Sequence, residues 1–132
     1  MDIKVGFREM VKNAEAVVET INVAAAMTLA GSSEVVFIDL RDVRELYREG
    51  KIPGAVHVPR GMLEFWIDPE SPYHKKVFTE PKRFVFYCNL GWRSALSAQV
   101  AQQMGLEDVC HIEGGFDAWK GAGGDVEQVP KR

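Results

Sequence analysis

The sequence predicts an α/β domain built on a parallel sheet that helices cover on both faces. Short apolar runs alternate with segments whose apolar residues recur at helical spacing, as in parallel sheets joined by right-handed helical crossovers. The run over 35–40 is almost continuously apolar, which is typical of a strand buried on both faces. With 132 residues, 46% of them hydrophobic and 27% charged, the chain has the size and composition of one globular domain.

The first elements are an amphipathic helix, a short strand and a second helix. Apolar residues at helical spacing predict a helix over 6–19, namely Phe7, Met10, Val11, Ala14, Val17 and Val18. A short strand at 20–21 follows. Asn22 is then a suitable N-cap for a helix over 23–30, which Gly31 ends.

The strand over 35–40 leads into a capped helix. Asp42 and Glu45 have the spacing of a capping box in its aspartate form, and Gly50 ends this helix. A Pro-Gly turn at 53–54 then precedes a short strand over 55–58.

The second half is irregular at first and then returns to alternation. Residues 62–66 form one or two helical turns, and the breaker-rich segment 68–72 is a loop. A strand over 83–87 follows, and a helix begins near Arg93 and ends at Gly105. Its apolar residues fall four apart along one face, at Leu96, Val100 and Met104.

The last predicted elements are a strand over 109–112 and a short helix over 116–120, which Gly114 and Gly115 open. The organisation is therefore an N-terminal amphipathic helix within 1–19, one domain over 20–122, and a Gly-rich, charged tail over 123–132 that we expect to be frayed.

Composition excludes several function classes. A net charge of −3 gives no basic surface for nucleic acid, and the longest apolar-rich stretch, 21–30, is too short for a membrane span of about 20 residues. The amino terminus lacks the pattern of a signal peptide, so we expect a cytoplasmic protein. Two cysteines and three dispersed histidines form no zinc-ligand pattern, and we expect no metal.

The candidate nucleophile is Cys88, where the apolar run 83–87 ends before a short loop and a helix. Backbone N–H groups at a helix start attract anions, and a cysteine there loses its proton more readily. Gly91 allows the loop to curl, so that successive N–H groups converge on the sulfur, and Arg93 offers donors to an oxyanion. The alternative is that Cys88 is a small buried hydrophobic residue.

Other polar residues have less specific contexts. Asp39, at the end of a strand, is expected to fix loops through backbone N–H groups, while Arg41 and Asp42 form an ion pair or a cap. Cys110 lies within a strand and is expected to be inert. Trp92 either walls the pocket or packs on the surface. The three histidines, His57, His74 and His111, are expected to be structural or solvated rather than catalytic.

Four segments, in order, resemble the single-domain rhodanese family of sulfurtransferases. They are Val36-Phe37-Ile38-Asp39-Leu40-Arg41-Asp42, Gly50-Lys51-Ile52-Pro53-Gly54-Ala55-Val56-His57-Val58-Pro59, Cys88-Asn89-Leu90-Gly91-Trp92-Arg93-Ser94 and Glu113-Gly114-Gly115-Phe116-Asp117-Ala118-Trp119. The resemblance covers roughly residues 20–122. It implies a three-layer, five-stranded parallel sheet and a cysteine that carries sulfur as a persulfide.

The resemblance further implies a thiosulfate sulfurtransferase-like enzyme. Sulfane sulfur would pass through a persulfide on Cys88 to a thiophilic acceptor, cyanide or a thiol, and no cofactor is needed. Substrate-binding residues would be Asn89, Leu90, Gly91, Trp92 and Arg93, with Asp39 and Arg41 positioning the loop. The partners would be small sulfur donors and acceptors or a protein persulfide, with no nucleic acid and no membrane.

The chain departs from the family pattern at two places. Lys51 stands where the family often has histidine, and Arg93 is the only cation of the loop, which favours a bulkier or less charged donor than thiosulfate. Two other functions remain open. Phosphatases and arsenate reductases use a similar cradle with one more residue between cysteine and arginine. A non-enzymatic persulfide carrier or regulatory binding module would also keep the fold.

Overall fold

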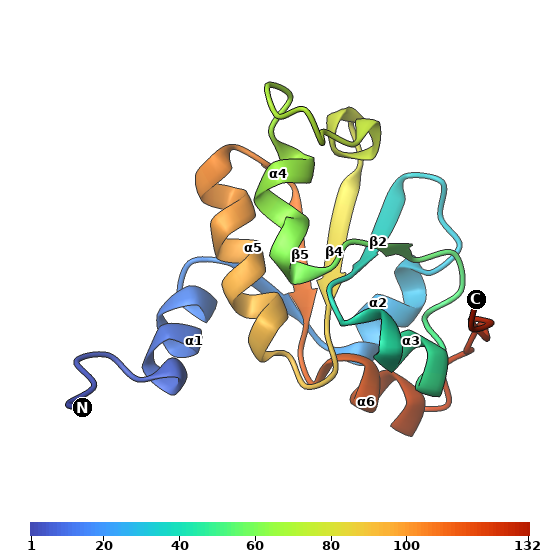
Figure 1. Ribbon diagram of the computed structural model, residues 1–132. Coiled ribbons are helices and arrows are strands. Elements are labelled where there is room, and N and C mark those ends of the chain that lie inside the picture. The colour runs from blue at the N-terminus through green and yellow to red at the C-terminus, as the bar shows by residue number, and fades with distance from the viewer.

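A computed structural model describes all 132 residues and contains one five-stranded sheet in which every pairing is parallel (Figure 1). The strand order is β1-β5-β4-β2-β3. The strands are β1 (Glu19–Ile21), β2 (Val35–Asp39), β3 (Val56–His57), β4 (Arg83–Tyr87) and β5 (Val109–Ile112). In register, Asp39 lies beside Tyr87 and Phe86 lies beside His111, so the carboxyl ends of β2, β4 and β5 meet at one edge.

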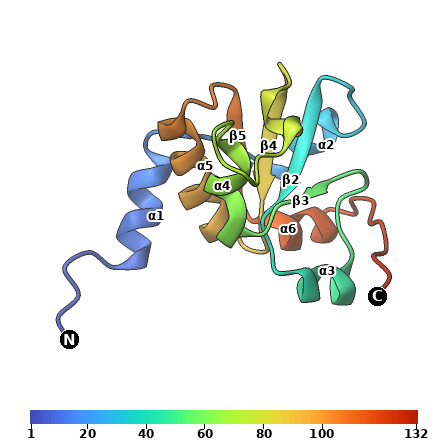
Figure 2. The same cartoon turned by 45° about the horizontal axis from the view of Figure 1, so that its top comes forward.

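Six α-helices surround the sheet, and two short 3-10 helices lie in the connection between β3 and β4. The α-helices are α1 (Phe7–Glu15), α2 (Val23–Leu29), α3 (Val43–Glu49), α4 (Leu63–Ile67), α5 (Trp92–Met104) and α6 (Gly115–Gly121), and the 3-10 helices are η1 (Arg60–Met62) and η2 (Lys76–Thr79). Figures 1 and 2 show α4 and α5 on one side of the sheet, with α1 outside α5, and α2, α3 and α6 on the other. The three-layer α/β fold predicted from the sequence is therefore confirmed.

The two faces of the sheet have separate apolar cores, because successive strand residues point to opposite sides. The core under α4 and α5 includes Ile38, Leu40, Leu63, Phe84, Phe86 and Ala98. The core under α2 and α6 includes Phe37, Val85, Tyr87, Cys110, Ile112 and Phe116. These two cores hold the carboxyl end of β4 in place. The loop that contains Cys88 begins there.

The predicted caps are confirmed, whereas the first helix is shorter than predicted. Asn22 Oδ1 accepts from the Ala25 N–H at 2.8 Å, and Asp42 with Glu45 forms a complete capping box on α3. The first helix ends at Glu15 rather than at residue 19. The helix cannot continue to residue 19, because residues 19–21 pair with β5 as strand β1.

The buried face of α5 is made of small residues rather than of the predicted apolar row. Ser94, Ala95, Ser97, Ala98 and Ala101 are buried, which lets the helix lie close to the sheet. Leu96 and Val100 are only half-buried, and Met104 is exposed. Leu96 and Ala95 instead pack against α1.

The segment after α6, for which the sequence predicts a frayed tail over 123–132, is docked in its first half. Trp119 Nε1 donates to the Asp125 carbonyl oxygen at 2.7 Å. Glu127 exchanges backbone hydrogen bonds of 2.9 and 2.8 Å with Lys51, and its side chain accepts from the Gly54 N–H. This docking has a local cause, since the Trp119 ring packs against Gly124, where no side chain stands in its way.

None of the six α-helices combines the length and the apolar character that crossing a membrane requires.

Candidate active site

Cys88 lies directly after β4 and faces the amino end of α5. Its side chain is buried, with 1% exposed, and its Sγ accepts hydrogen bonds from the N–H groups of Gly91 at 3.2 Å and Ser94 at 3.4 Å. Gly91 is the N-cap of the 13-residue helix and has a φ of 103°, the left-handed conformation that glycine adopts most readily. Two N–H donors and the positive end of a helix dipole both stabilise a thiolate at this position.

The opposite side of the loop is fixed by α6. The N–H of Phe116 donates to the Cys88 carbonyl oxygen at 2.8 Å, and the N–H of Asp117 donates to that of Asn89 at 3.1 Å. With these carbonyl oxygens bound to α6, the N–H groups that follow them can face the sulfur. Gly115 makes this approach feasible, because a Cβ there would overlap the Cys88 carbonyl oxygen and lie 2.7 Å from that of Asn89. The sequence shows this glycine, but its role becomes apparent only in the fold.

A hollow of about 120 Å³ opens above the sulfur. It is lined by Cys88, Asn89, Leu90, Trp92 and Arg93, which include four of the five residues predicted to bind substrate. Gly91, the fifth, contributes its N–H to Sγ instead of lining the hollow. Leu90 and Trp92 are about half exposed and form an apolar rim, and Asn89 Oδ1 is buried without a hydrogen-bond partner.

Trp92 both walls this hollow and packs on the surface, so the two alternatives left open for it occur together. Its ring lies 4.9 Å from the ring of Phe7 in α1, centroid to centroid. The Arg8 guanidinium lies over both rings, 4.9 Å from the Phe7 centroid and 5.3 Å from that of Trp92. The first helix therefore reaches the rim of the site.

Arg93 is held by a carboxylate rather than left free. Its Nη1 and Nη2 donate to the two carboxylate oxygens of Glu45 in α3, at 2.8 and 3.0 Å. The pair holds the pKa of Glu45 below its usual range and, together with the nearby Cys88 sulfur, raises the pKa of Arg93. The expected loop cation is present, but its charge is largely balanced before a substrate binds.

Asp39 and Arg41 form a fully buried ion pair behind the site. Arg41 Nη2 lies 2.7 Å from Asp39 Oδ2 and also donates to the Gly50 carbonyl oxygen at 2.7 Å. Burial disfavours the charged guanidinium, but the hydrogen bonds and charge of Asp39 outweigh it and raise the pKa of Arg41. Its guanidinium also lies 4.3 Å from the Phe116 ring centroid. The pair thus connects the loop after β2 to α6. Asp42, the next residue in the chain, caps α3.

Two polar residues near the sulfur were not predicted as site residues. Ser94 Oγ lies 3.7 Å from Cys88 Sγ and 3.0 Å from Nδ1 of His111. His111 is fully buried, and burial lowers its pKa to about 4, so the ring is neutral at physiological pH. Ser94 ends the segment that begins at Cys88, whereas nothing local in the sequence connects it to His111.

The remaining candidates lie elsewhere. His57 Nε2 contacts the Arg41 carbonyl oxygen at 2.6 Å, and His74 Nδ1 contacts that of Trp66 at 3.1 Å. Cys110 is buried in β5, where burial raises the pKa of its thiol to about 12. No group of three His, Cys, Asp or Glu side chains converges as a bound metal ion would require.

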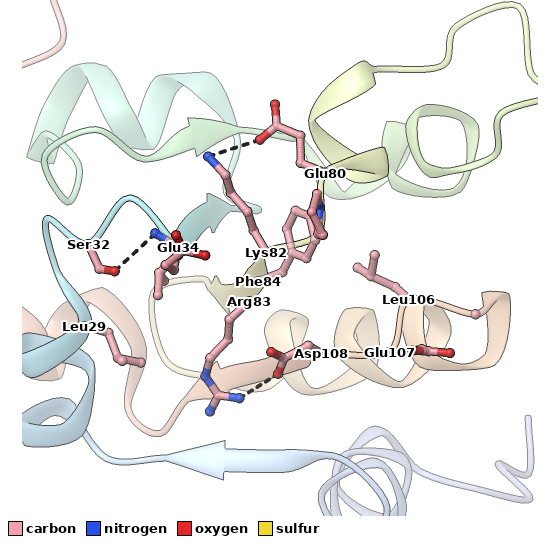
Figure 3. A pocket seen from close by; sticks show the side chains of 13 residues that line it. Leu29, Ser32, Glu34, Glu80, Lys82, Arg83, Phe84, Leu106, Glu107 and Asp108 are labelled. Carbon is pink, nitrogen blue, oxygen red and sulfur yellow. Dashed lines mark hydrogen bonds and ion pairs between the residues drawn. The ribbon is translucent and has the colours of Figure 1, made fainter.

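A hollow of about 650 Å³ lies at the opposite edge of the sheet, where β2 and β4 begin (Figure 3). Its two cations are already paired with carboxylates. Arg83 binds Asp108 and Glu19, each at 2.8 Å, and Lys82 lies 3.3 Å from Glu80. Its lining contains no cysteine, so the small hollow over Cys88 is the better candidate for thiol chemistry.

Comparison with known proteins agrees with this geometry. The chain is 28% identical over 97 residues to the mouse (Mus musculus) thiosulfate sulfurtransferase/rhodanese-like domain-containing protein 3, covering 70% of this chain and 62% of that protein. It is 29% identical over 102 residues to a thiosulfate sulfurtransferase of Pseudoalteromonas translucida, covering 77% and 89%.

A solved structure from Rhodopseudomonas palustris, described as a protein of unknown function and a possible tyrosine phosphatase, is 54% identical. It superimposes with a TM-score of 0.94, and the match covers 96% of this chain and 98% of that chain.

The family model of the rhodanese-like domain matches residues 22–122, which contain β2 to β5, the Cys88 loop and α6. The chain therefore belongs to the rhodanese-like domain family.

Proposed function

We propose that this protein is a sulfurtransferase that carries sulfane sulfur as a persulfide on Cys88. The observation that carries the proposal is the pair of N–H donors, from Gly91 and Ser94, that meet Sγ at the amino end of α5. Such a cradle stabilises the thiolate as the attacking group and again as the leaving group. The thiosulfate sulfurtransferase from P. translucida supports the same chemistry.

The reaction has two half-reactions. In the first, the Cys88 thiolate attacks the outer sulfur of a donor; with thiosulfate, the sulfur–sulfur bond breaks and sulfite leaves with its electron pair. In the second, a thiolate or cyanide attacks the outer sulfur of the persulfide, and the Cys88 thiolate leaves. This is covalent ping-pong catalysis, and the N–H groups that bind the thiolate act in both halves.

The loop favours a donor of low charge. Arg93 is its only cation, and Glu45 binds both of its terminal nitrogens. The rim is apolar, since Leu90 and Trp92 are 51% and 43% exposed. A thiol-derived or protein-bound persulfide matches a weakly charged hollow with an apolar rim better than the thiosulfate dianion does.

Phosphatase chemistry is the second candidate, because the R. palustris structure is described as a possible tyrosine phosphatase. Two features of this chain oppose it. Four residues separate Cys88 from Arg93, and a tetrahedral phosphate needs a wider loop. Arg93, which would bind the phosphate oxygens, is paired with Glu45.

The test is intact-protein mass spectrometry after exposure to thiosulfate and to a small organic persulfide, with and without cyanide. We expect Cys88 to gain the mass of one sulfur atom and to lose it to cyanide. Gain and loss without sustained turnover would favour a persulfide carrier. No gain from either donor would overturn the proposal, and hydrolysis of an aryl phosphate by the same sample would replace it with the phosphatase.

A further inference from the structure

A row of polar side chains leads from the Cys88 sulfur through the interior to the surface beside α1. Cys88 Sγ lies 3.7 Å from Ser94 Oγ, which lies 3.0 Å from Nδ1 of His111. On the far side of the ring, Nε2 lies 3.0 Å from Thr20 Oγ1 and 3.4 Å from a carboxylate oxygen of Glu15. The first three groups are buried, whereas the Glu15 side chain is 40% exposed. The row thus begins at the reacting atom and ends at solvent.

We propose that Ser94 and His111 form a proton relay for the Cys88 thiol, in which the imidazole changes tautomer without becoming charged. The proposal deepens the sulfurtransferase function proposed above and rests on it for its use. Ser94 contacts the reacting sulfur directly. His111 and Glu15 act through Ser94 and are positioning residues.

The protonated state has one consistent set of hydrogen bonds. The Cys88 thiol donates to Ser94 Oγ, and the Ser94 hydroxyl donates to Nδ1 of His111. The ring proton is then on Nε2, which donates to the Thr20 hydroxyl oxygen at 3.0 Å and lies 3.4 Å from the Glu15 carboxylate. The Gly91 carbonyl oxygen is a competing acceptor for the Ser94 hydroxyl, but it lies farther away, at 3.3 Å.

When the thiol ionises, each proton of the row moves by one step, and the net result is the loss of one proton to water. The thiol proton passes to Ser94 Oγ, the Ser94 proton passes to Nδ1, and the Nε2 proton passes through Glu15 to water. The thiolate then accepts from the Ser94 hydroxyl, which in turn accepts from Nδ1–H. One proton leaves, the sulfur gains one negative charge, and the imidazole is neutral before and after.

The two partners of Nε2 are the observation that favours a tautomer change over a fixed ring. A nitrogen that always carries a proton needs only an acceptor, and one that never does needs only a donor. Here the Thr20 hydroxyl can accept from Nε2–H or donate to the nitrogen when that proton has gone, and the charge of the Glu15 carboxylate, 3.4 Å away, favours the protonated nitrogen. The pair therefore serves both tautomers.

The surroundings keep the ring neutral throughout. Glu15 of α1 is the charged side chain that pairs with His111, and its hydrogen-bond partners are Thr20 of β1 and Ser94 of α5, with Cys88 after β4 beyond Ser94. The ring is fully buried, and burial lowers the pKa of His111 to about 4. At pH values well above this pKa the imidazole is uncharged, so it can change tautomer without becoming an imidazolium.

The test follows the two ring nitrogens of His111 by ¹⁵N NMR between pH 5 and pH 10, with His111→Gln used to assign the signals. In parallel, the rate of Cys88 alkylation by iodoacetamide reports ionisation of the thiol. We expect the proton to move from Nε2 to Nδ1 with the same midpoint as the alkylation rate. The step should persist in Cys110→Ser and be absent in Cys88→Ser, because a serine hydroxyl does not ionise in this range.

Variants of the row separate a relay from a structural contact. Ser94→Ala should abolish the tautomer step while Cys88 still ionises, and Ser94→Thr should restore it. Glu15→Ala should enrich the Nδ1–H form at low pH, whereas Glu9→Ala, on the same helix but without an ion pair to His111, should leave the populations unchanged.

A ring that keeps one tautomer across the Cys88 titration, or a step that survives in Ser94→Ala, would overturn the relay. Neither measurement needs a sulfur donor or turnover. The relay can therefore fail while persulfide formation succeeds, and a missing persulfide would leave the tautomer result unchanged.

Discussion

The carboxylate of Glu45 binds the guanidinium of Arg93 through two hydrogen bonds of 2.8 and 3.0 Å, across 48 positions of the chain. The same carboxylate closes the capping box of α3 by accepting from the Asp42 N–H at 2.9 Å. One side chain therefore sets the start of α3 and balances the charge of Arg93 in the Cys88 loop.

Glu45→Gln should improve the use of thiosulfate. Glutamine still completes a capping box, but it no longer balances the charge of Arg93. We expect kcat/KM for thiosulfate to rise on the order of fivefold, since freeing a partly exposed charge is worth about 1 kcal/mol. Steady-state kinetics with thiosulfate and with an uncharged persulfide donor measure the effect, and only the first should change.

The matched control is Glu49→Gln, which removes another carboxylate of α3, one that pairs with Lys120 away from the loop. Adding Arg93→Ala to Glu45→Gln should cancel the gain. Equal kcat/KM values for Glu45→Gln and the unmodified protein would show that Arg93 does not contact the donor.

Cys88→Ser should abolish persulfide formation, whereas Cys110→Ser should retain it. The Cys88 sulfur accepts hydrogen bonds from two backbone N–H groups, while burial raises the pKa of the Cys110 thiol to about 12. Mass spectrometry after exposure to a donor distinguishes the two variants. Sulfur on Cys110, or activity in Cys88→Ser, would contradict this assignment.

Gly115→Ala should impair catalysis more than its stability cost explains. The new methyl group would overlap the Cys88 carbonyl oxygen and force the loop away from α6. Because a small displacement of reacting groups can cost about 100-fold in rate, we expect a loss of kcat/KM on that order. Thermal unfolding should show a folded protein with a lower Tm.

Gly121→Ala is the control for helix α6, since nothing lies within 4 Å of a Cβ at that position. It should leave kcat/KM close to that of the unmodified protein. Full activity in Gly115→Ala would mean that the loop adapts without its contact to α6.

The stability of the protein should fall between pH 7 and pH 5 because of His111. Burial lowers the pKa of the folded ring to about 4 from 6.5, so in this window the unfolded chain binds a proton that the folded protein does not. The stabilisation is present above pH 6.5 and is lost as the pH falls towards 4. The loss from pH 7 to pH 5 is roughly 2 kcal/mol of unfolding free energy.

Urea denaturation at the two pH values measures this loss. In His111→Gln, the difference in unfolding free energy between pH 7 and pH 5 should be smaller by most of the roughly 2 kcal/mol that His111 contributes. In His74→Gln this difference should remain as in the unmodified protein. An unchanged difference in His111→Gln would assign the acid sensitivity to other groups.

Elements with local signals were predicted well from the sequence. β4 and β5 have the predicted bounds, 83–87 and 109–112, because apolar residues dominate each short segment. The caps at Asn22 and Asp42 were predicted because a cap depends on residues within one turn. Cys88 was selected for the same reason, since its strand, loop and helix are contiguous.

The parts that were missed depend on residues far apart in the chain. The contact between Glu45 and Arg93, and that between Ser94 and His111, exist only because the strand order brings α3, α5 and β5 to one edge. The buried face of α5 was missed because close packing against the sheet selected alanine and serine there, and hydrophobicity alone favoured Leu96.

The pairing of β1 with β5 has a consequence for where this domain can be cut. The family match begins at residue 22, yet β1 covers β5 through residues 19–21, and α1 precedes both. A chain trimmed to the match would expose the backbone of a fully buried strand as an open sheet edge, and such edges template aggregation. The unit that keeps β5 covered therefore begins no later than β1, three residues before the family match.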